Sequence, residues 1–245
     1  MSKSRQEKIK VVIGHFAWGI HQRISSRECQ YISFIRDPLS RILSEYWYAR
    51  NAARGYPVFD EKIYRAKMPL ETYIKTGFSL SVDNLLVRSF SGIGCEGYGT
   101  AFRTSVKTKS KEFKCINEDD YKVAKANIDK YYKFIGITEL FDESMLLIKL
   151  NLGWKNIFYE SKNIGTKDNI ISSDITQEII ELNKWDYKLY NYCKERFIMQ
   201  CKENDIFDKS RYYRKINKYV YPIIKSKDFI LSKPKSCFKK YLFRK

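Results

Sequence analysis

The chain has 245 residues, of which 44% are hydrophobic and 16% aromatic, and its formal net charge is +18. This length and composition suffice for one α/β domain with a core, or for one domain with a tail. No stretch of about 18 residues is uniformly apolar, so we expect no membrane-spanning helix. The apolar run at 11–13 is too short for the core of a signal peptide, and we therefore expect a cytoplasmic chain.

The positive charge is concentrated at the C-terminus. Residues 209–245 contain 13 Lys and Arg residues and a single acidic residue, Asp228, interspersed with Tyr and Phe. We therefore divide the chain into an α/β domain at 1–208 and a basic, aromatic tail at 209–245. Such a tail suits an anionic membrane surface, a polyanionic glycan or nucleic acid, and the alternative is a solvated tail without a partner. No nucleic-acid-reading motif accompanies the charge, so we do not expect that partner.

Apolar periodicity and capping residues predict strands that alternate with helices, which indicates a parallel sheet. Asn117 and Asp142 are placed to cap two of these helices. Stretches rich in Gly, Pro and polar residues at 51–68 and 91–114 are expected to be loops. In chain order, the predicted elements are a strand at 11–14, a connection or short helix at 18–27, a strand at 30–36, helices at 38–50, 70–76, 82–90 and 118–131, a strand at 132–138, a helix at 142–152 and one or two helices across 175–200.

The turn after the strand at 30–36 is the most informative part of the sequence. Asp37 is a good N-cap, and Pro38 suits the first position of a helix. Arg36 then lies at the carboxyl end of a parallel strand, where ligands of α/β sheets collect and helix N-termini attract anions. The sequence therefore predicts an anion site at this turn.

Two residues of the following helix fit the same site. Arg41 and Ser44 are three residues apart and are expected to share a helix face. An arginine fork and a serine hydroxyl together suit a phosphate. The alternative is that Arg36 pairs with a nearby carboxylate while Ser44 only packs. His15 lies upstream, and a histidine near a phosphate site suggests group transfer from a nucleotide. The alternative for His15 is a histidine at the end of a strand whose ring is hydrogen-bonded to backbone groups. With two histidines and no Cys-x-x-Cys pair, we expect no metal site.

Five segments, in chain order, resemble the carbohydrate sulfotransferases of the heparan sulfate 2-O-sulfotransferase-like group. They cover about residues 11–195. The segments are Gly14-His15-Phe16 with Gly19 and His21; residues 31–38 with Arg41, Ser44 and Tyr46; residues 83–88 with Ser91 and Gly92; residues 134–139 with Phe141, Asp142 and Ser144; and Trp185-Asp186 with Leu189 and Tyr190.

The resemblance implies a P-loop-like parallel sheet flanked by helices, and a donor, 3′-phosphoadenosine 5′-phosphosulfate. Arg36 and Ser44 would hold its 3′-phosphate, and His15 would be the general base that takes a proton from a carbohydrate hydroxyl. His21 and Arg88 would contact the glycan acceptor, with a structural role for Arg88 as the alternative. No metal is implied.

One part of the family pattern has no counterpart in this sequence. The family's first strand leads into a loop of the Lys-x-Gly-x-Thr-Ser type that wraps the 5′-phosphosulfate, and we expect both to be absent here. The alternative function is therefore an inactive remnant of the sulfotransferase fold that binds nucleotides or polyanions. The same absence leaves the compartment open between a cytoplasmic, membrane-peripheral protein and a Golgi chain that has lost its anchor.

Overall fold

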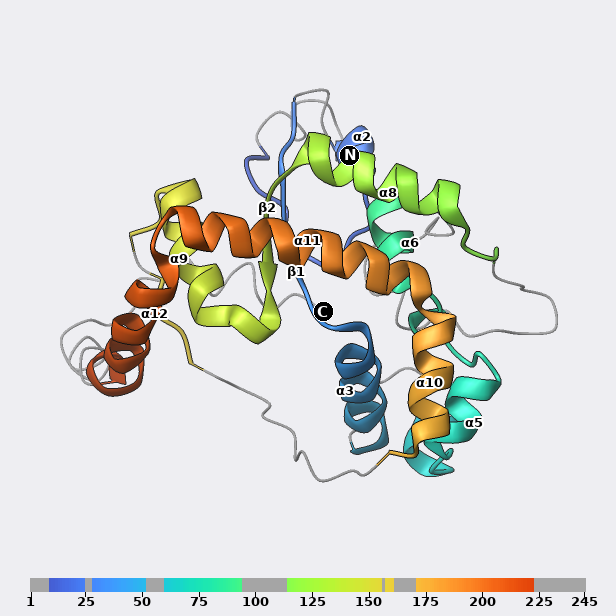
Figure 1. Ribbon diagram of the computed structural model, residues 1–245. Coiled ribbons are helices and arrows are strands. Elements are labelled where there is room, and N and C mark those ends of the chain that lie inside the picture. The colour runs from blue at the N-terminus through green and yellow to red at the C-terminus, as the bar shows by residue number, and fades with distance from the viewer. Residues whose placement is uncertain are drawn as a thin grey trace. The chain divides into compact units, whose positions relative to one another are not determined.

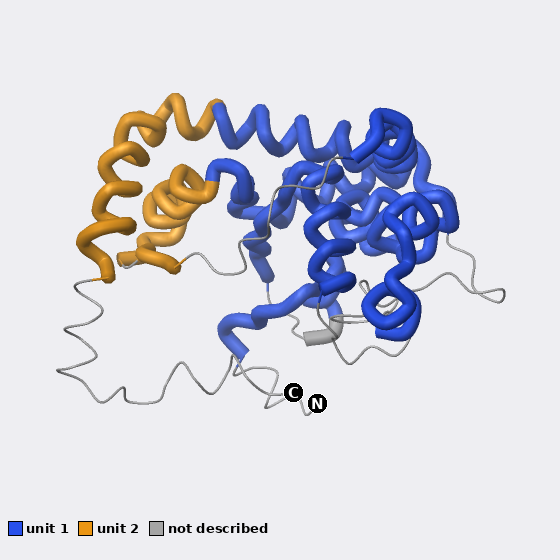
Figure 2. The backbone as a smooth tube through the Cα atoms, turned by 90° about the horizontal axis from the view of Figure 1, so that it is seen from below, with its two compact units in different colours: residues 1–140, 163–198 blue, residues 141–162, 199–245 orange. Residues whose placement is uncertain are grey.

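The computed structural model describes residues 9–24, 28–51, 60–93, 114–155, 157–160 and 171–222 (Figure 1). The chain forms two compact units. Unit 1 comprises residues 1–140 and 163–198, and unit 2 comprises residues 141–162 and 199–245 (Figure 2). The fold is mixed α/β and mostly helical, with a small parallel sheet. This confirms the predicted fold class.

Unit 1 contains the sheet and most of the helices. Its elements are α2 (His21–Ile24), β1 (Tyr31–Ile35), α3 (Pro38–Asn51), the π-helix η1 (Asp60–Arg65), α5 (Leu70–Lys75), the 3₁₀-helix η2 (Leu80–Val82), α6 (Leu85–Ser91), α8 (Glu118–Tyr131), β2 (Tyr132–Ile137), the 3₁₀-helix η3 (Thr138–Leu140), α10 (Ser173–Leu182) and the greater part of α11 (Lys184–Glu203).

Strands β1 and β2 pair in parallel, with Tyr31 opposite Tyr132 and Ile35 opposite Ile137. Both strands therefore end at the same edge of the sheet. Gly136 faces Phe34 so closely that a Cβ atom there would lie 2.5 Å from the Phe34 ring. Only glycine fits at this position without a shift of that ring.

Helices α3, α5 and α10 form a hydrophobic core together with η1. Its centre consists of fully buried side chains, among them Ile42, Ile63, Tyr73 and Ile179. Ile63 explains why residues 60–65, predicted as loop, are helical: the π-turn places this side chain inside the core. This core fixes the direction of α3, the helix that begins at the predicted anion site.

The predicted capping of α8 is confirmed. Asn117 accepts hydrogen bonds from the backbone of Asp119 and Asp120, and the Asp120 carboxylate accepts one from the Asn117 amide. These reciprocal bonds form a capping box, which satisfies N–H groups that have no partner inside the helix. Helix α8 leads directly into β2, so the cap fixes where the second strand begins.

Three predictions of secondary structure were wrong. Residues 11–14 form no strand, because no described strand pairs with them, and Val11 and Ile13 are 75% and 82% exposed. The helix predicted at 82–90 begins only at Leu85, because Asn84 has a left-handed backbone. Residues 51–68, predicted as a loop, include η1. The predicted loop at 91–114 lies mostly outside the described residues.

Unit 2 contains α9 (Phe141–Leu152), the end of α11, α12 (Ile206–Lys215) and the π-helix η4 (Ile216–Val220). Glu143 accepts a hydrogen bond of 2.7 Å from the Ser210 hydroxyl, which joins α9 to α12. The described part of the segment predicted as a tail, residues 209–222, is thus helical. The division at residue 208 stays a prediction.

Candidate functional site

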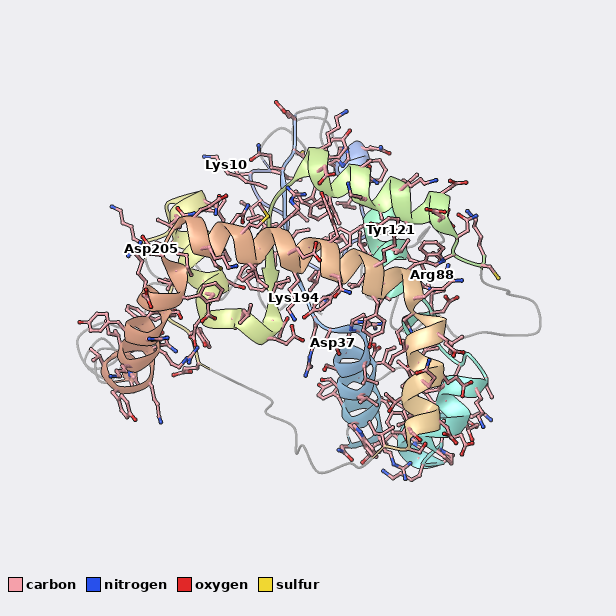
Figure 3. All side chains as sticks on the ribbon, in the orientation of Figure 1. Lys10, Asp37, Arg88, Tyr121, Lys194 and Asp205 are labelled. Atoms are coloured by element: carbon pink, nitrogen blue, oxygen red, sulfur yellow. The ribbon has the colours of Figure 1, made fainter. Side chains whose placement is uncertain are left out.

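The turn between β1 and α3 has the geometry that the sequence predicted. Asp37 accepts a hydrogen bond of 2.8 Å from the Ser40 amide through Oδ1, so it caps α3 (Figure 3). Pro38 is the first residue of the helix and is buried. The capped N-terminus of α3 therefore meets the carboxyl end of β1, where the helix dipole favours an anion.

Arg36 lies at this edge and is half-buried. Within the described part of the chain, the ion pairs formed by arginine and lysine do not include Arg36. The alternative, in which a neighbouring carboxylate neutralises Arg36, therefore has no support among the described residues. A half-buried guanidinium beside a helix N-terminus suits an anionic ligand with several oxygen atoms.

Glu139 holds the two strand ends together. Its Oε1 accepts a hydrogen bond of 2.9 Å from the Asp37 amide, and its Oε2 accepts one of 3.2 Å from the Tyr190 hydroxyl on α11. Thr138 donates a further bond of 2.9 Å to the Ile35 carbonyl. These contacts favour an anchoring role for Glu139 over a catalytic one.

Helix α11 contributes Tyr190, which belongs to the fifth segment of the resemblance, together with Tyr187 and Lys194, which the sequence analysis did not single out. Burial raises the pKa of the Tyr187 hydroxyl, and the nearby Asp37 carboxylate raises it further. The Lys194 ammonium lies 5.5 Å from the centre of the Tyr190 ring. Tyr187, Tyr190 and Lys194 are spaced by three and four residues, which places them on one helix face. For Tyr187 and Lys194, that spacing was the only signal in the sequence.

Arg41 and Ser44 do not act together as predicted. The Arg41 guanidinium turns inward, where Nη2 donates a bond of 2.7 Å to the Ser81 carbonyl and lies 4.0 Å from Asp186. Ser44 is exposed. It lies about 9 Å along the axis of α3 from Pro38, given the rise of an α-helix. The phosphate-binding role of Ser44 stays a prediction.

His21 lies at the opposite end of the sheet from Arg36. Its Nδ1 shares a hydrogen bond of 2.6 Å with the hydroxyl of Tyr31, the first residue of β1. The rings of Trp18 and Tyr131 also contact the imidazole, and burial lowers the pKa of His21. Because β1 is about 16 Å long, His21 lies far from a ligand bound at Arg36. Its predicted contact with the glycan acceptor stays a prediction.

His15 lies in an exposed bend at residues 14–15. The segment that follows it is held by the Trp18 amide, which donates a hydrogen bond of 2.7 Å to the Ser89 carbonyl on α6. The base role of His15 stays a prediction.

Arg88 is fully buried on α6 (Figure 3). Its Nη2 donates bonds of 2.6 Å to the Asp83 carboxylate and 2.7 Å to the Lys114 carbonyl, and its Nε donates one of 2.8 Å to the Asp83 carbonyl. These bonds join α6 to the segment that leads into α8. Of the two roles considered for Arg88, the geometry favours the structural one.

Comparison with known proteins finds heparan-sulfate 6-O-sulfotransferase 2 of Homo sapiens and of Mus musculus. Each is 26% identical to this chain over 193 residues, an alignment that covers 71% of the chain and 30% of the relative. The chain thus matches about a third of the length of these relatives. No family model matches the sequence.

The similarity supports the broad resemblance to carbohydrate sulfotransferases that the five segments indicated. The narrower likeness to the 2-O group is not confirmed, since these relatives are 6-O-sulfotransferases. Among the described helices, none has the length and apolar character needed to cross a membrane. The described residues also contain no group of three or more His, Cys, Asp or Glu side chains suited to a metal ion.

Proposed function

We propose that this chain carries the nucleotide site of a carbohydrate sulfotransferase, and that it transfers a sulfuryl group from 3′-phosphoadenosine 5′-phosphosulfate to a glycan hydroxyl. The observation that carries the proposal is the turn at Arg36, in a chain distantly similar to two sulfotransferases. A glycan is proposed as the acceptor because both relatives are named for heparan sulfate.

In this proposal the 3′-phosphate of the donor binds at the β1–α3 turn. Arg36 supplies a planar fork of donors, and the capped start of α3 supplies backbone N–H groups and partial positive charge. Ser44 adds a hydroxyl donor from the exposed side of the same helix. Glu139 and Tyr190 hold the turn in position before the ligand arrives, which lowers the entropy lost on binding.

The reaction needs a base near the acceptor. In the proposed step the acceptor oxygen attacks sulfur, the bond between sulfur and the 5′-phosphate oxygen breaks, and His15 takes the hydroxyl proton. A histidine suits this task because its ordinary pKa of about 6.5 allows it to accept a proton near neutral pH. The products are a sulfated sugar and adenosine 3′,5′-bisphosphate. Positioning and charge stabilisation supply most of the acceleration, as in phosphoryl transfer.

Sulfate transfer to an unsulfated heparan-type oligosaccharide tests the proposal. We expect transfer by the wild-type chain and its loss in His15→Ala. An unchanged rate in His15→Ala would remove the base assignment. A wild-type chain that binds the nucleotide but transfers no sulfate would favour the alternative of a nucleotide-binding module.

A further inference from the structure

Unit 2 contains a pocket of about 590 Å³ that the proposed reaction does not use. The pocket is lined by Asp142 and Tyr159. It is also lined by Arg214 on α12, by Lys218 on η4 and by Tyr221, the residue that follows η4. This volume lies within the range typical of sites for small ligands. All lining residues belong to unit 2.

The polar side chains of this pocket are fixed by one another. Asp142 accepts hydrogen bonds of 2.8 Å from the Tyr159 hydroxyl and 2.7 Å from Arg214 Nε. Asn217 bonds both the amide and the carbonyl of Tyr159, at 3.0 and 3.1 Å. The Arg214 side chain is 60% exposed although it is paired twice, since its Nη2 also lies 3.5 Å from the Glu143 carboxylate. A ligand would thus meet hydrogen-bonding groups that are already oriented.

An aromatic surface forms part of the same wall. The rings of Tyr213, Phe158 and Tyr221 stack in series, with centroid distances of 5.8 and 5.2 Å and interplanar angles of 15° and 19°. Tyr221 is the end of this stack that lines the pocket. The wide turn of η4, closed by a bond from the Tyr221 amide to the Ile216 carbonyl, brings Tyr221 and Lys218 to the pocket. Turns of this kind are frequent at functional sites.

The charges that line the pocket balance. Asp142 and Glu160 are negative, while Arg214 and Lys218 are positive. A pocket with paired donors and acceptors, no net charge and one aromatic wall suits a ring that carries hydroxyl groups on its edge and C–H groups on its face. We propose that this pocket binds a pyranose residue of a glycan, at a site separate from the Arg36 turn. The identification of that glycan as the acceptor rests on the proposed function.

Titration of the full chain with an unsulfated octasaccharide of alternating glucuronic acid and N-acetylglucosamine tests this site. Tyr221→Ala is expected to weaken binding about tenfold through loss of the stacking surface. Tyr219→Ala is the matched control, because Tyr219 lies on the same segment, is 61% exposed and does not line the pocket. It is expected to bind like the wild type. Lys218→Gln, compared with Lys215→Gln, provides a second pair that replaces exposed side chains.

Three results would overturn the pocket assignment: no binding of the octasaccharide by the wild type, equal affinities within both pairs, or an equal loss of affinity for dextran sulfate in Tyr221→Ala. The last would indicate a general polyanion surface. Titration with adenosine 3′,5′-bisphosphate is expected to be unchanged in Tyr221→Ala, which verifies that this variant folds. If the wild type fails to bind the nucleotide, the proposed function fails, while the comparison of Tyr221 with Tyr219 still decides the pocket.

Discussion

Asp186, in the first turn of α11, caps helix α6, and Asn84, the residue before α6, caps helix α11. The Asp186 carboxylate accepts hydrogen bonds of 2.9 and 2.8 Å from the amides of Leu86 and Val87 at the start of α6. Asn84 Oδ1 accepts bonds of 3.1 Å from the amides of Trp185 and Asp186 at the start of α11. The two helix starts are therefore fixed against each other, and with them the α11 residues near the Arg36 turn.

Replacement of Asn84 is expected to loosen this junction. Asn84→Ala removes the acceptor for the amides of Trp185 and Asp186. It also leaves alanine at φ 47°, without the bond that the Asn84 side chain donates to Asp83. We expect the free energy of unfolding to fall by about 2–3 kcal/mol. Asn84→Gly removes the same bonds but tolerates the left-handed backbone, so it should be less destabilised by about 1 kcal/mol. Urea unfolding of both variants measures this, and equal losses would argue against strain at this position.

The buried Asp186 predicts a dependence of stability on pH. Burial raises the pKa of Asp186 to about 6, against the opposing effects of Arg41 and the two backbone amides. Because the pKa is higher in the folded than in the unfolded chain, the contribution of Asp186 to stability is full below about pH 4 and is lost as the pH rises through 6.

Comparison of the wild type with Asp186→Asn isolates this contribution, since the amide cannot titrate. We expect the wild type to lose stability relative to Asp186→Asn between pH 4 and 7, by an amount on the order of 2 kcal/mol. Urea unfolding at pH 4, 5, 6 and 7 gives the difference. A difference that is constant across these values would show that Asp186 stays ionised throughout.

Changes at Arg88 are expected to affect stability and not acceptor binding. The buried guanidinium joins Asp83 to the Lys114 carbonyl, so Arg88→Ala should lower the free energy of unfolding by about 3–5 kcal/mol. Arg88→Lys keeps the charge and is expected to fold with a smaller loss. In that variant the KM for the glycan should equal that of the wild type, and a raised KM at unchanged stability would restore the acceptor-binding role.

Two substitutions of Glu139 distinguish the effect of its hydrogen bonds on nucleotide binding from the effect of its negative charge. Glu139→Gln keeps an acceptor for the Asp37 amide and a donor for the Tyr190 oxygen while it removes a negative charge beside the anion site. We expect it to bind adenosine 3′,5′-bisphosphate as tightly as the wild type or a few times more tightly. Glu139→Ala loses both bonds and should bind more weakly, by about 1–2 kcal/mol. Calorimetric titration distinguishes them. Weak binding by Glu139→Gln would instead indicate that the carboxylate itself is required.

Elements whose signals are local were predictable from the sequence. The cap at Asn117 and the Asp37-Pro38 start of α3 place two helices to within one residue of their observed starts. The strand at 11–14 was not predictable correctly, since an apolar run forms a strand only where a partner strand exists. The π-turn of η1 has no sequence signature and follows from burial of Ile63 in the core.

The candidate site was predictable only in part, because some of its contacts join residues that are far apart in the sequence. Arg36 follows from a strand and a turn that are adjacent in sequence. The inward turn of Arg41 toward Ser81 and Asp186, and the bond from Tyr190 to Glu139, join residues that are 40 or more positions apart. Such contacts depend on the tertiary fold, which spacing along one chain does not reveal.

The most direct test of the proposed nucleotide site is a titration of adenosine 3′,5′-bisphosphate into the wild type and Arg36→Ala. Arg211→Ala is the matched control, because that arginine is 82% exposed in its side chain and lies in unit 2. The proposal predicts saturable binding by the wild type and by Arg211→Ala, and affinity lower by about 1.5–3 kcal/mol, or at least about tenfold, in Arg36→Ala. Equal affinity in Arg36→Ala and the wild type would contradict the assignment of the 3′-phosphate to this turn.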